Sequence, residues 1–235
     1  IHALSARIPL HLLKWQTHHQ GHSILVAFWG NYLVASLFSV VNAREAVFSA
    51  TAFDIGLGVI TGTLFLVNFL LFNKNIRLNG MALSVSIMRV SLLIPVVFSL
   101  WLFQENLLWL NGVGIVLILA AFVIMGKYRQ HHFLWIWALL LFFLTGFTEF
   151  SMKIYRVYGG EMGSGMEHVF LFYLFTASFI VNSALLIWRR EKWHWGAVGL
   201  GFLIGVPNQL TSYFLMKGLN TIPAAIAYPL AASLV

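Results

Sequence analysis

Seven apolar runs, each about as long as a membrane-spanning helix, are the feature that most constrains this chain. A helix that crosses a hydrocarbon core of roughly 30 Å needs about 20 apolar residues, because it rises 1.5 Å per residue. The runs show no strict alternation, which argues against the strands of a membrane barrel. They cover residues 24–41, 52–72, 82–103, 107–125, 133–152, 169–188 and 195–216, with partial runs at 1–13 and 221–235.

The composition excludes an ordinary cytosolic enzyme and a disordered protein. Of the 235 residues, 60% are hydrophobic and only 9% are charged, whereas a soluble domain carries roughly a quarter charged residues. The excess of 14 Lys and Arg over 7 Asp and Glu lies mostly at the ends of the apolar runs, which indicates membrane topology rather than nucleic-acid binding. The absence of cysteine removes disulfides, thiolate zinc sites and cysteine nucleophiles.

Two copies of one pattern are found in the chain. The segment from Gly56 to Gly62 recurs 143 positions later, from Gly199 to Gly205, and Arg44-Glu45 recurs 146 positions later as Arg190-Glu191. Corresponding runs are five spans apart, and an odd number of spans inverts the second copy in the membrane. We therefore expect an all-α, polytopic membrane helix bundle built from two inverted five-helix repeats, at residues 1–126 and 127–235.

The same alignment predicts that the chain is incomplete. The intact fold would have ten helices, with about 14 residues preceding residue 1, as estimated from the offset between the repeats. The chain is expected to lack part of the first helix and the last one to two helices.

The sequence resembles the drug/metabolite transporter superfamily, specifically the EamA family. The similar residues are Gly218 to Ala225 (GLNTIPAA), followed by Ala-Tyr-Pro-Leu at 227–230, and Gln104-Glu105 at the end of a first-half run. Met88 stands where the second copy has Pro229, and the Arg89 that follows is unusual in that helix. The resemblance implies two inverted five-helix halves around a central cavity, and secondary transport, usually export.

Arg89 and Glu149 are ionisable residues inside apolar runs, where a charge is costly and therefore indicates function. Arg89 could bind an anionic or carboxylate-bearing substrate through paired N–H donors, or it could be a structural charge satisfied by backbone carbonyls. Glu149 could bind and release a proton and so couple transport to protons, or it could pair with Lys153 one turn later.

Further polar residues in the apolar runs complete the predicted cavity. The candidates for substrate binding are Asn68, Arg89, Glu149, Asn208, Gln209, Tyr213 and Tyr228, and the candidate hinges are Pro95, Pro207, Pro223 and Pro229. The resemblance implies that the helices holding these residues border the cavity. The alternative for each single residue is an interhelical hydrogen bond.

No catalytic or metal site is expected. His11, His18, His19 and His22 lie in a polar link without a carboxylate, which favours an exposed loop over a zinc site. The glycines at 56, 58, 62, 199, 201 and 205 are expected to permit close helix packing. A membrane enzyme acting on lipid-linked substrates would need a clustered acid, base or metal, and the seven acidic residues are scattered.

The resulting hypothesis is a secondary transporter that exports a small organic metabolite or drug-like solute by alternating access around a midplane cavity. It lies in the cell membrane (the inner membrane in a bacterium), with lipid, a solute and possible protons as partners, and without cofactor or nucleic acid. The alternative is a non-transporting structural or sensory membrane protein. Nine of the basic residues lie in links after odd-numbered spans and four after even-numbered ones, which places the N-terminus outside, whereas the family pattern places both termini in the cytoplasm.

Overall fold

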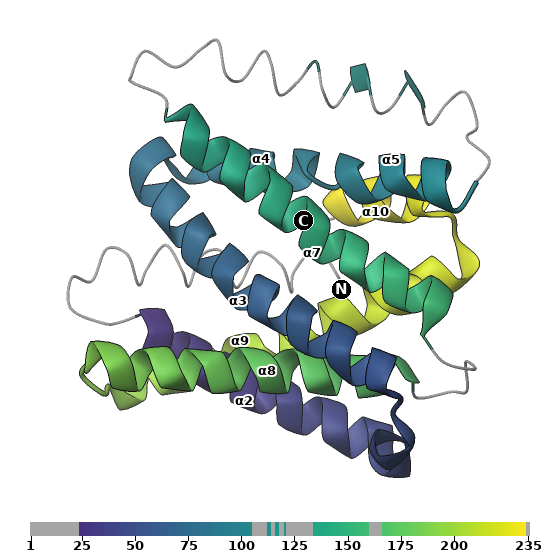
Figure 1. Ribbon diagram of the computed structural model, residues 1–235. Coiled ribbons are helices and arrows are strands. Elements are labelled where there is room, and N and C mark those ends of the chain that lie inside the picture. The colour runs from purple at the N-terminus through teal and green to yellow at the C-terminus, as the bar shows by residue number, and fades with distance from the viewer. Residues whose placement is uncertain are drawn as a thin grey trace. The chain divides into compact units, whose positions relative to one another are not determined.

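The computed structural model describes residues 24–104, 112, 113, 116, 117, 120, 134–159 and 166–233, without the side chains of 220 and 229–233. The ordered elements in these ranges are helical (Figure 1). They are α2 (Ile24–Ala43), the 3₁₀ helix η1 (Arg44–Ser49), α3 (Ala52–Asn79), α4 (Met81–Val90), α5 (Leu93–Leu102), α7 (Trp135–Tyr158), α8 (Met166–Arg189), α9 (Trp195–Thr221) and α10 (Ala224–Ser233).

Five stretches of the described chain are long and apolar enough to cross a membrane. They are Ile24–Ser49, Ala52–Asn79, Met81–Leu102, Trp135–Tyr158 and Met166–Arg189. The predicted run 195–216 does form a helix, α9, but α9 is not one of the five, because Pro207, Asn208 and Gln209 interrupt its apolar sequence. The predicted run 107–125 and the partial run 1–13 lie outside the described residues, apart from five isolated positions.

The apolar run 82–103 contains a helix break that its hydropathy did not predict. Ser91 and Leu92 separate α4 from α5, and the N–H of Ile94 donates to the Ser91 carbonyl over 2.9 Å. Pro95 has no N–H to donate to that carbonyl, and its ring clashes with the carbonyl four residues earlier in a regular helix. The break therefore lies where Pro95 requires it.

The described helices belong to two compact units. Unit 1 contains α2, η1, α3 up to Leu66, α8, and α9 up to Lys217. Unit 2 contains α3 from Val67, α4, α5, α7 up to Arg156, the last residues of α9, and α10. Each unit thus holds helices from both predicted repeats.

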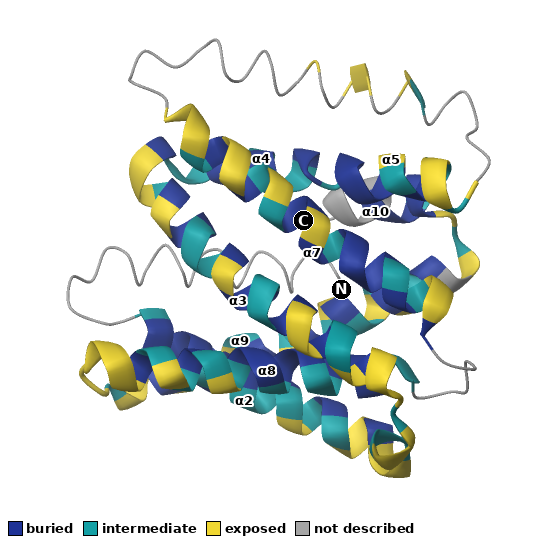
Figure 2. Ribbon diagram, viewed as in Figure 1, coloured by how far each residue is buried: buried dark blue, intermediate teal, exposed yellow. Residues whose placement is uncertain are grey.

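In unit 1, α2 and α8 pack against each other in opposite directions. Early residues of α2 contact late residues of α8: Asn182 Nδ2 donates to the Leu25 carbonyl over 2.9 Å. Later in α2, the hydroxyls of Ser36 and Thr176 are 2.7 Å apart. The pairing therefore runs antiparallel, as the ribbon also shows, and the buried residues of α8 lie along its middle (Figure 2).

Glycines bring α3 close to α8 within the same unit. A Cβ added at Gly58 would lie 2.7 Å from the Cβ of Tyr173, and one added at Gly62 would lie 3.1 Å from the Cβ of Ala177. The hydroxyl of Ser178 donates to the Gly62 carbonyl over 2.7 Å. Contacts that advance together along both helices mean that α3 and α8 run in the same direction here.

Glycines likewise bring α9 close to α2. A Cβ added at Gly201 would contact the Ala27 carbonyl oxygen and lie 2.9 Å from the Asn31 nitrogen. One added at Gly205 would lie 2.7 Å from the Asn31 oxygen and 2.9 Å from the Cβ of Val34. These two helices also run in the same direction, whereas Gly56 and Gly199 have no atom within 4 Å of an added Cβ.

Unit 2 contains an antiparallel pair, α3 and α7, held together at one end by two asparagines. Asn75 Nδ2 donates to the Trp137 carbonyl over 3.0 Å. Asn79 accepts the Leu134 N–H over 3.0 Å through Oδ1, and its Nδ2 donates to the Leu134 carbonyl over 3.4 Å. These bonds explain why α3 continues as a helix to Asn79, beyond the apolar run that ends at residue 72.

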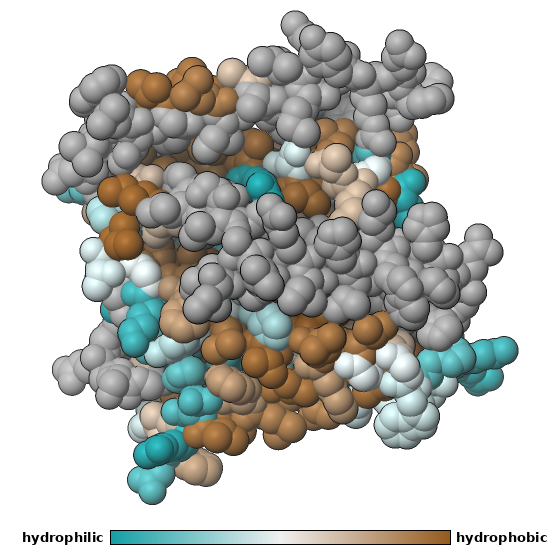
Figure 3. Space-filling model, turned by 180° about the vertical axis from the view of Figure 1, so that it is seen from behind, coloured by the Kyte–Doolittle hydropathy of each residue, from teal (hydrophilic) through white to brown (hydrophobic). Residues whose placement is uncertain are grey.

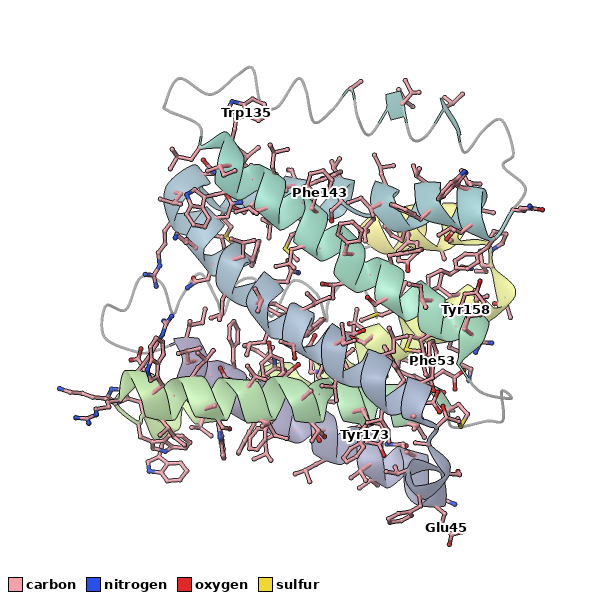
Figure 4. All side chains as sticks on the ribbon, in the orientation of Figure 1. Glu45, Phe53, Trp135, Phe143, Tyr158 and Tyr173 are labelled. Atoms are coloured by element: carbon pink, nitrogen blue, oxygen red, sulfur yellow. The ribbon has the colours of Figure 1, made fainter. Side chains whose placement is uncertain are left out.

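Large apolar side chains are also exposed along the helices of both units. On α7, Trp135 and Phe143 are 60% and 50% exposed, and Trp135 points away from the helix in Figure 4. On α8, Ile187 is 79% exposed. Water would oppose such surfaces on a soluble protein, whereas lipid tails accept them.

Candidate functional site

Polar side chains from α2 and α9 meet inside unit 1. Asn208 Nδ2 donates to Asn31 Oδ1 over 3.2 Å. One residue further along α9, Gln209 Nε2 donates to the hydroxyl of Ser39 over 3.4 Å. Gln209 and Ser39 are both fully buried, so two turns of α2 face the polar middle of α9.

An aromatic pair extends this polar group toward the end of α9. The rings of His168, on α8, and Tyr213 are stacked, with their centroids 4.3 Å apart and 15° between their planes. His168 Nδ1 lies 3.5 Å from Gln209 Nε2. Lys217 Nζ donates to the Tyr213 hydroxyl over 3.4 Å and lies on an exposed part of the helix.

The amide oxygen of Gln209 is the unusual atom of this group. Oε1 is buried and accepts no hydrogen bond from the part of the chain that is described. An acceptor left without a donor in an apolar interior costs about 1–3 kcal/mol. A solute carrying an N–H or O–H could satisfy it. We call Asn31, Ser39, His168, Asn208, Gln209 and Tyr213 the amide cluster.

Arg89 and Glu149 both belong to unit 2. Arg89, near the end of α4, is half-buried, and its Nε atom is buried. The Oε2 atom of Glu149, on α7, is buried as well. Neither atom forms a hydrogen bond within the described ranges. The Arg89 N–H is therefore a donor available to a solute or water, and the Glu149 oxygen is available to a solute, water or a proton.

Tyr228 and Asn68 form hydrogen bonds between helices in unit 2. The fully buried Tyr228 donates its hydroxyl to the Glu149 carbonyl over 2.9 Å, which joins α10 to α7. Asn68 Oδ1 accepts the hydroxyl of Thr145 over 2.8 Å, which joins α3 to α7. For both residues the structure records the packing bonds that were the alternative to a binding role.

The four predicted hinge prolines occupy different settings. Pro95 follows the α4–α5 break, and Pro223 lies between α9 and α10, where its carbonyl accepts the N–H groups of Ile226 and Ala227. Pro207 lies inside the continuous helix α9, and Thr211 donates to its carbonyl over 2.8 Å. Pro229 lies within α10.

The structure thus divides the predicted binding residues between the two units. Asn208, Gln209 and Tyr213 lie in unit 1 and belong to the amide cluster, whereas Asn68, Arg89, Glu149 and Tyr228 lie in unit 2. Three members of the cluster, Asn31, Ser39 and His168, were not among the residues predicted from the sequence. Asn31 and Ser39 are polar residues eight positions apart in an apolar run, so they lie on one helix face, which was the available signal.

No group of three His, Asp or Glu residues that could hold a metal ion is present in the ranges covered by the structure. The histidines at 11, 18, 19 and 22 lie outside those ranges. No family model matches the chain, and no curated protein matches it. The fold itself, with five apolar stretches of membrane-spanning length, defines the class: a polytopic, integral membrane protein.

Proposed function

We propose that this chain forms the core of a secondary transporter of the drug/metabolite type. In this proposal two inverted repeats export a small organic solute by alternating access around a site near the bilayer midplane. The fold class and the membrane location are its foundation. The proposal adds the inversion, the transport and the residues that would bind the solute.

One observation carries the proposal: the reciprocal contacts in unit 1. If a pseudo-two-fold axis relates the copies, a contact from the first copy to the second must recur with the copies exchanged. Gly58 contacts Tyr173, and Gly201 contacts Ala27. Gly201 lies 143 positions after Gly58, and Tyr173 lies 146 positions after Ala27, so the two contacts are related by the offsets of the repeat.

The second glycine contact follows the same rule. Gly62 contacts Ala177, and Gly205, 143 positions later, contacts Asn31, which lies 146 positions before Ala177. The directions agree as well: α3 runs with α8, α9 runs with α2, and α2 runs against α8. Corresponding helices of the two copies therefore have opposite directions in unit 1, as inversion requires.

The amide cluster supports a solute site. Its residues are amides, a hydroxyl and stacked rings, which bind neutral or weakly charged groups of a small solute through hydrogen bonds and ring contacts. The buried Gln209 oxygen adds an acceptor that the described protein leaves unused. A site of this kind is expected to hold the solute loosely enough to release it on the other side.

Reconstitution of the full-length protein in liposomes tests the function. Amino acids, nucleosides, sugars and organic cations are first screened by thermal shift, and the solutes that stabilise the protein are then measured for flux. We expect saturable flux that falls at least tenfold in the Gln209→Leu variant, because the leucine removes both the donor and the acceptor.

Thr211→Val is the matched control for this experiment. Thr211 lies on the same helix but is exposed, and its hydroxyl donates to the Pro207 carbonyl of its own helix. We expect its flux to remain within twofold of the unmodified protein. A folded protein that transports none of the screened solutes would contradict the proposal and favour a structural or sensory role.

A further inference from the structure

The link between α8 and α9 forms a basic, aromatic surface at one end of unit 1. Arg189, Arg190 and Lys192 are exposed within four positions, next to Glu191. Trp188 is 77% exposed, Trp193 41% and Trp195 76%. We call these six residues, without Glu191, the basic rim. Over the helices of unit 1, Figure 3 shows apolar side chains between hydrophilic ones that gather at the two ends.

The tryptophans of this surface lie close to one another. The rings of Trp193 and Trp195 are 5.6 Å apart, and Trp193 lies 5.0 Å from Trp29 on α2. Indole rings favour the boundary between hydrocarbon and headgroups, because the ring is apolar and its N–H is a donor. Their position next to three cations places those cations at the level of the lipid phosphates.

Arg190 occupies a backbone position where glycine is the usual residue. Its φ angle is 50°, in the left-handed region. Its N–H donates to the Ile187 carbonyl and the N–H of Glu191 donates to the Leu186 carbonyl, over 3.2 and 3.3 Å. This bonding pattern ends a helix and favours glycine, which has no Cβ to strain. The chain therefore carries an arginine here in spite of an unfavourable backbone conformation.

Arg44, which corresponds to Arg190 in the other copy, lies at the opposite end of unit 1, where the surrounding charges differ. Arg44 also follows the end of its helix in the left-handed region, with φ at 51°, and it also precedes a glutamate. Among the residues that the structure describes, this end of the unit has two cations, Arg44 and Lys217, and three acids, Glu45, Asp54 and Glu167. The described link between α8 and α9 has the three cations of the basic rim against one acid, Glu191. Figure 4 shows Glu45 pointing outward at this end.

We propose that the basic rim binds the headgroups of anionic phospholipids. A guanidinium presents paired N–H donors that match phosphate oxygens, and the ammonium of Lys192 adds a third charge beside them. A zwitterionic headgroup carries a cation that the rim repels, so the rim selects lipids with net negative charge. This binding does not depend on the proposed transport.

Lipid retention measured by native mass spectrometry tests the proposal. The full-length protein is equilibrated in mixed micelles with equal amounts of phosphatidylglycerol and phosphatidylcholine. Each cation near an anionic surface contributes about fivefold in affinity. We therefore expect at least fivefold tighter retention of phosphatidylglycerol, and a preference below twofold in the R189Q/R190Q/K192Q variant. Equal retention by the unmodified protein, or an undiminished preference in the variant, would overturn the proposal.

Two single glycine variants separate binding from folding. Arg190→Gly removes a rim cation and relieves the backbone, so we expect a two- to fivefold loss of the preference with an unchanged or higher unfolding temperature. Arg44→Gly makes the same change at the opposite end, so we expect the preference to stay the same. An equal loss in both variants would show that the rim is not the binding surface and would overturn the proposal.

Discussion

Alanine substitutions at four glycines test the close helix contacts of unit 1. Gly62 and Gly205 are in contact with backbone atoms of α8 and α2, whereas Gly56 and Gly199 have open space where a Cβ would be added. Both pairs are related by the 143-position offset. Each predicted copy therefore supplies one glycine that is in contact with a neighbouring helix and one that is not.

The expected magnitudes follow from two opposing effects. Replacing glycine by alanine in a helix stabilises it by about 1 kcal/mol. At Gly205 the new Cβ would lie 2.7 Å from the Asn31 oxygen, which must move by about 0.3–0.7 Å to reach the ordinary range, and overpacking of this kind costs about 1–3 kcal/mol. At Gly62 the shift would also stretch the bond from Ser178, worth about 1 kcal/mol.

We therefore expect Gly205→Ala to lower the free energy of unfolding by up to about 2 kcal/mol, and Gly62→Ala to lower it by about 1–3 kcal/mol. Gly56→Ala and Gly199→Ala are expected to raise it by about 0.5–1 kcal/mol. Reversible unfolding of the purified protein in mixed micelles of increasing SDS content, followed by circular dichroism, measures all four. Equal effects in the two pairs would refute the packing described for α3 with α8 and for α9 with α2.

Two other substitutions test single interactions in unit 2 by the same unfolding measurement. Asn79→Ala removes both bonds to Leu134, so we expect the free energy of unfolding to fall by about 2 kcal/mol. The control Asn42→Ala removes an exposed bond and is expected to cost less than about 0.5 kcal/mol. A comparable loss in the two variants would contradict the role of Asn79. Tyr228→Phe removes the bond to the Glu149 carbonyl, so we expect a loss of about 1 kcal/mol, and an unchanged stability would contradict that bond.

The positions of the helices follow from the apolar runs, but their ends do not. The run 52–72 predicts the start of α3, yet the helix continues to Asn79 because Asn75 and Asn79 bond to α7. Such bonds depend on a partner 55–62 residues away in the sequence. Hydropathy within a window carries no information about that partner.

The composition of the amide cluster was also only partly accessible from the sequence. Gln209 and Asn208 are conspicuous in an apolar helix, whereas His168 lies at the beginning of a run and resembles an ordinary end residue. In a membrane helix both the lipid-facing and the packed sides are apolar, so periodicity does not identify the inward face. The glycine repeat does identify an inward face, because Gly58, Gly62, Gly201 and Gly205 lie on faces that pack closely against another helix.

The sidedness of two glutamates tests the inverted repeat most directly. Glu45 and Glu191 are equivalent in the two copies, both are exposed, and the chain has no native cysteine. Single Glu45→Cys and Glu191→Cys variants are treated with a membrane-impermeant maleimide in sealed vesicles, before and after permeabilisation. Inversion predicts that one cysteine reacts in sealed vesicles and the other only after permeabilisation. Reaction of both from the same side would contradict it.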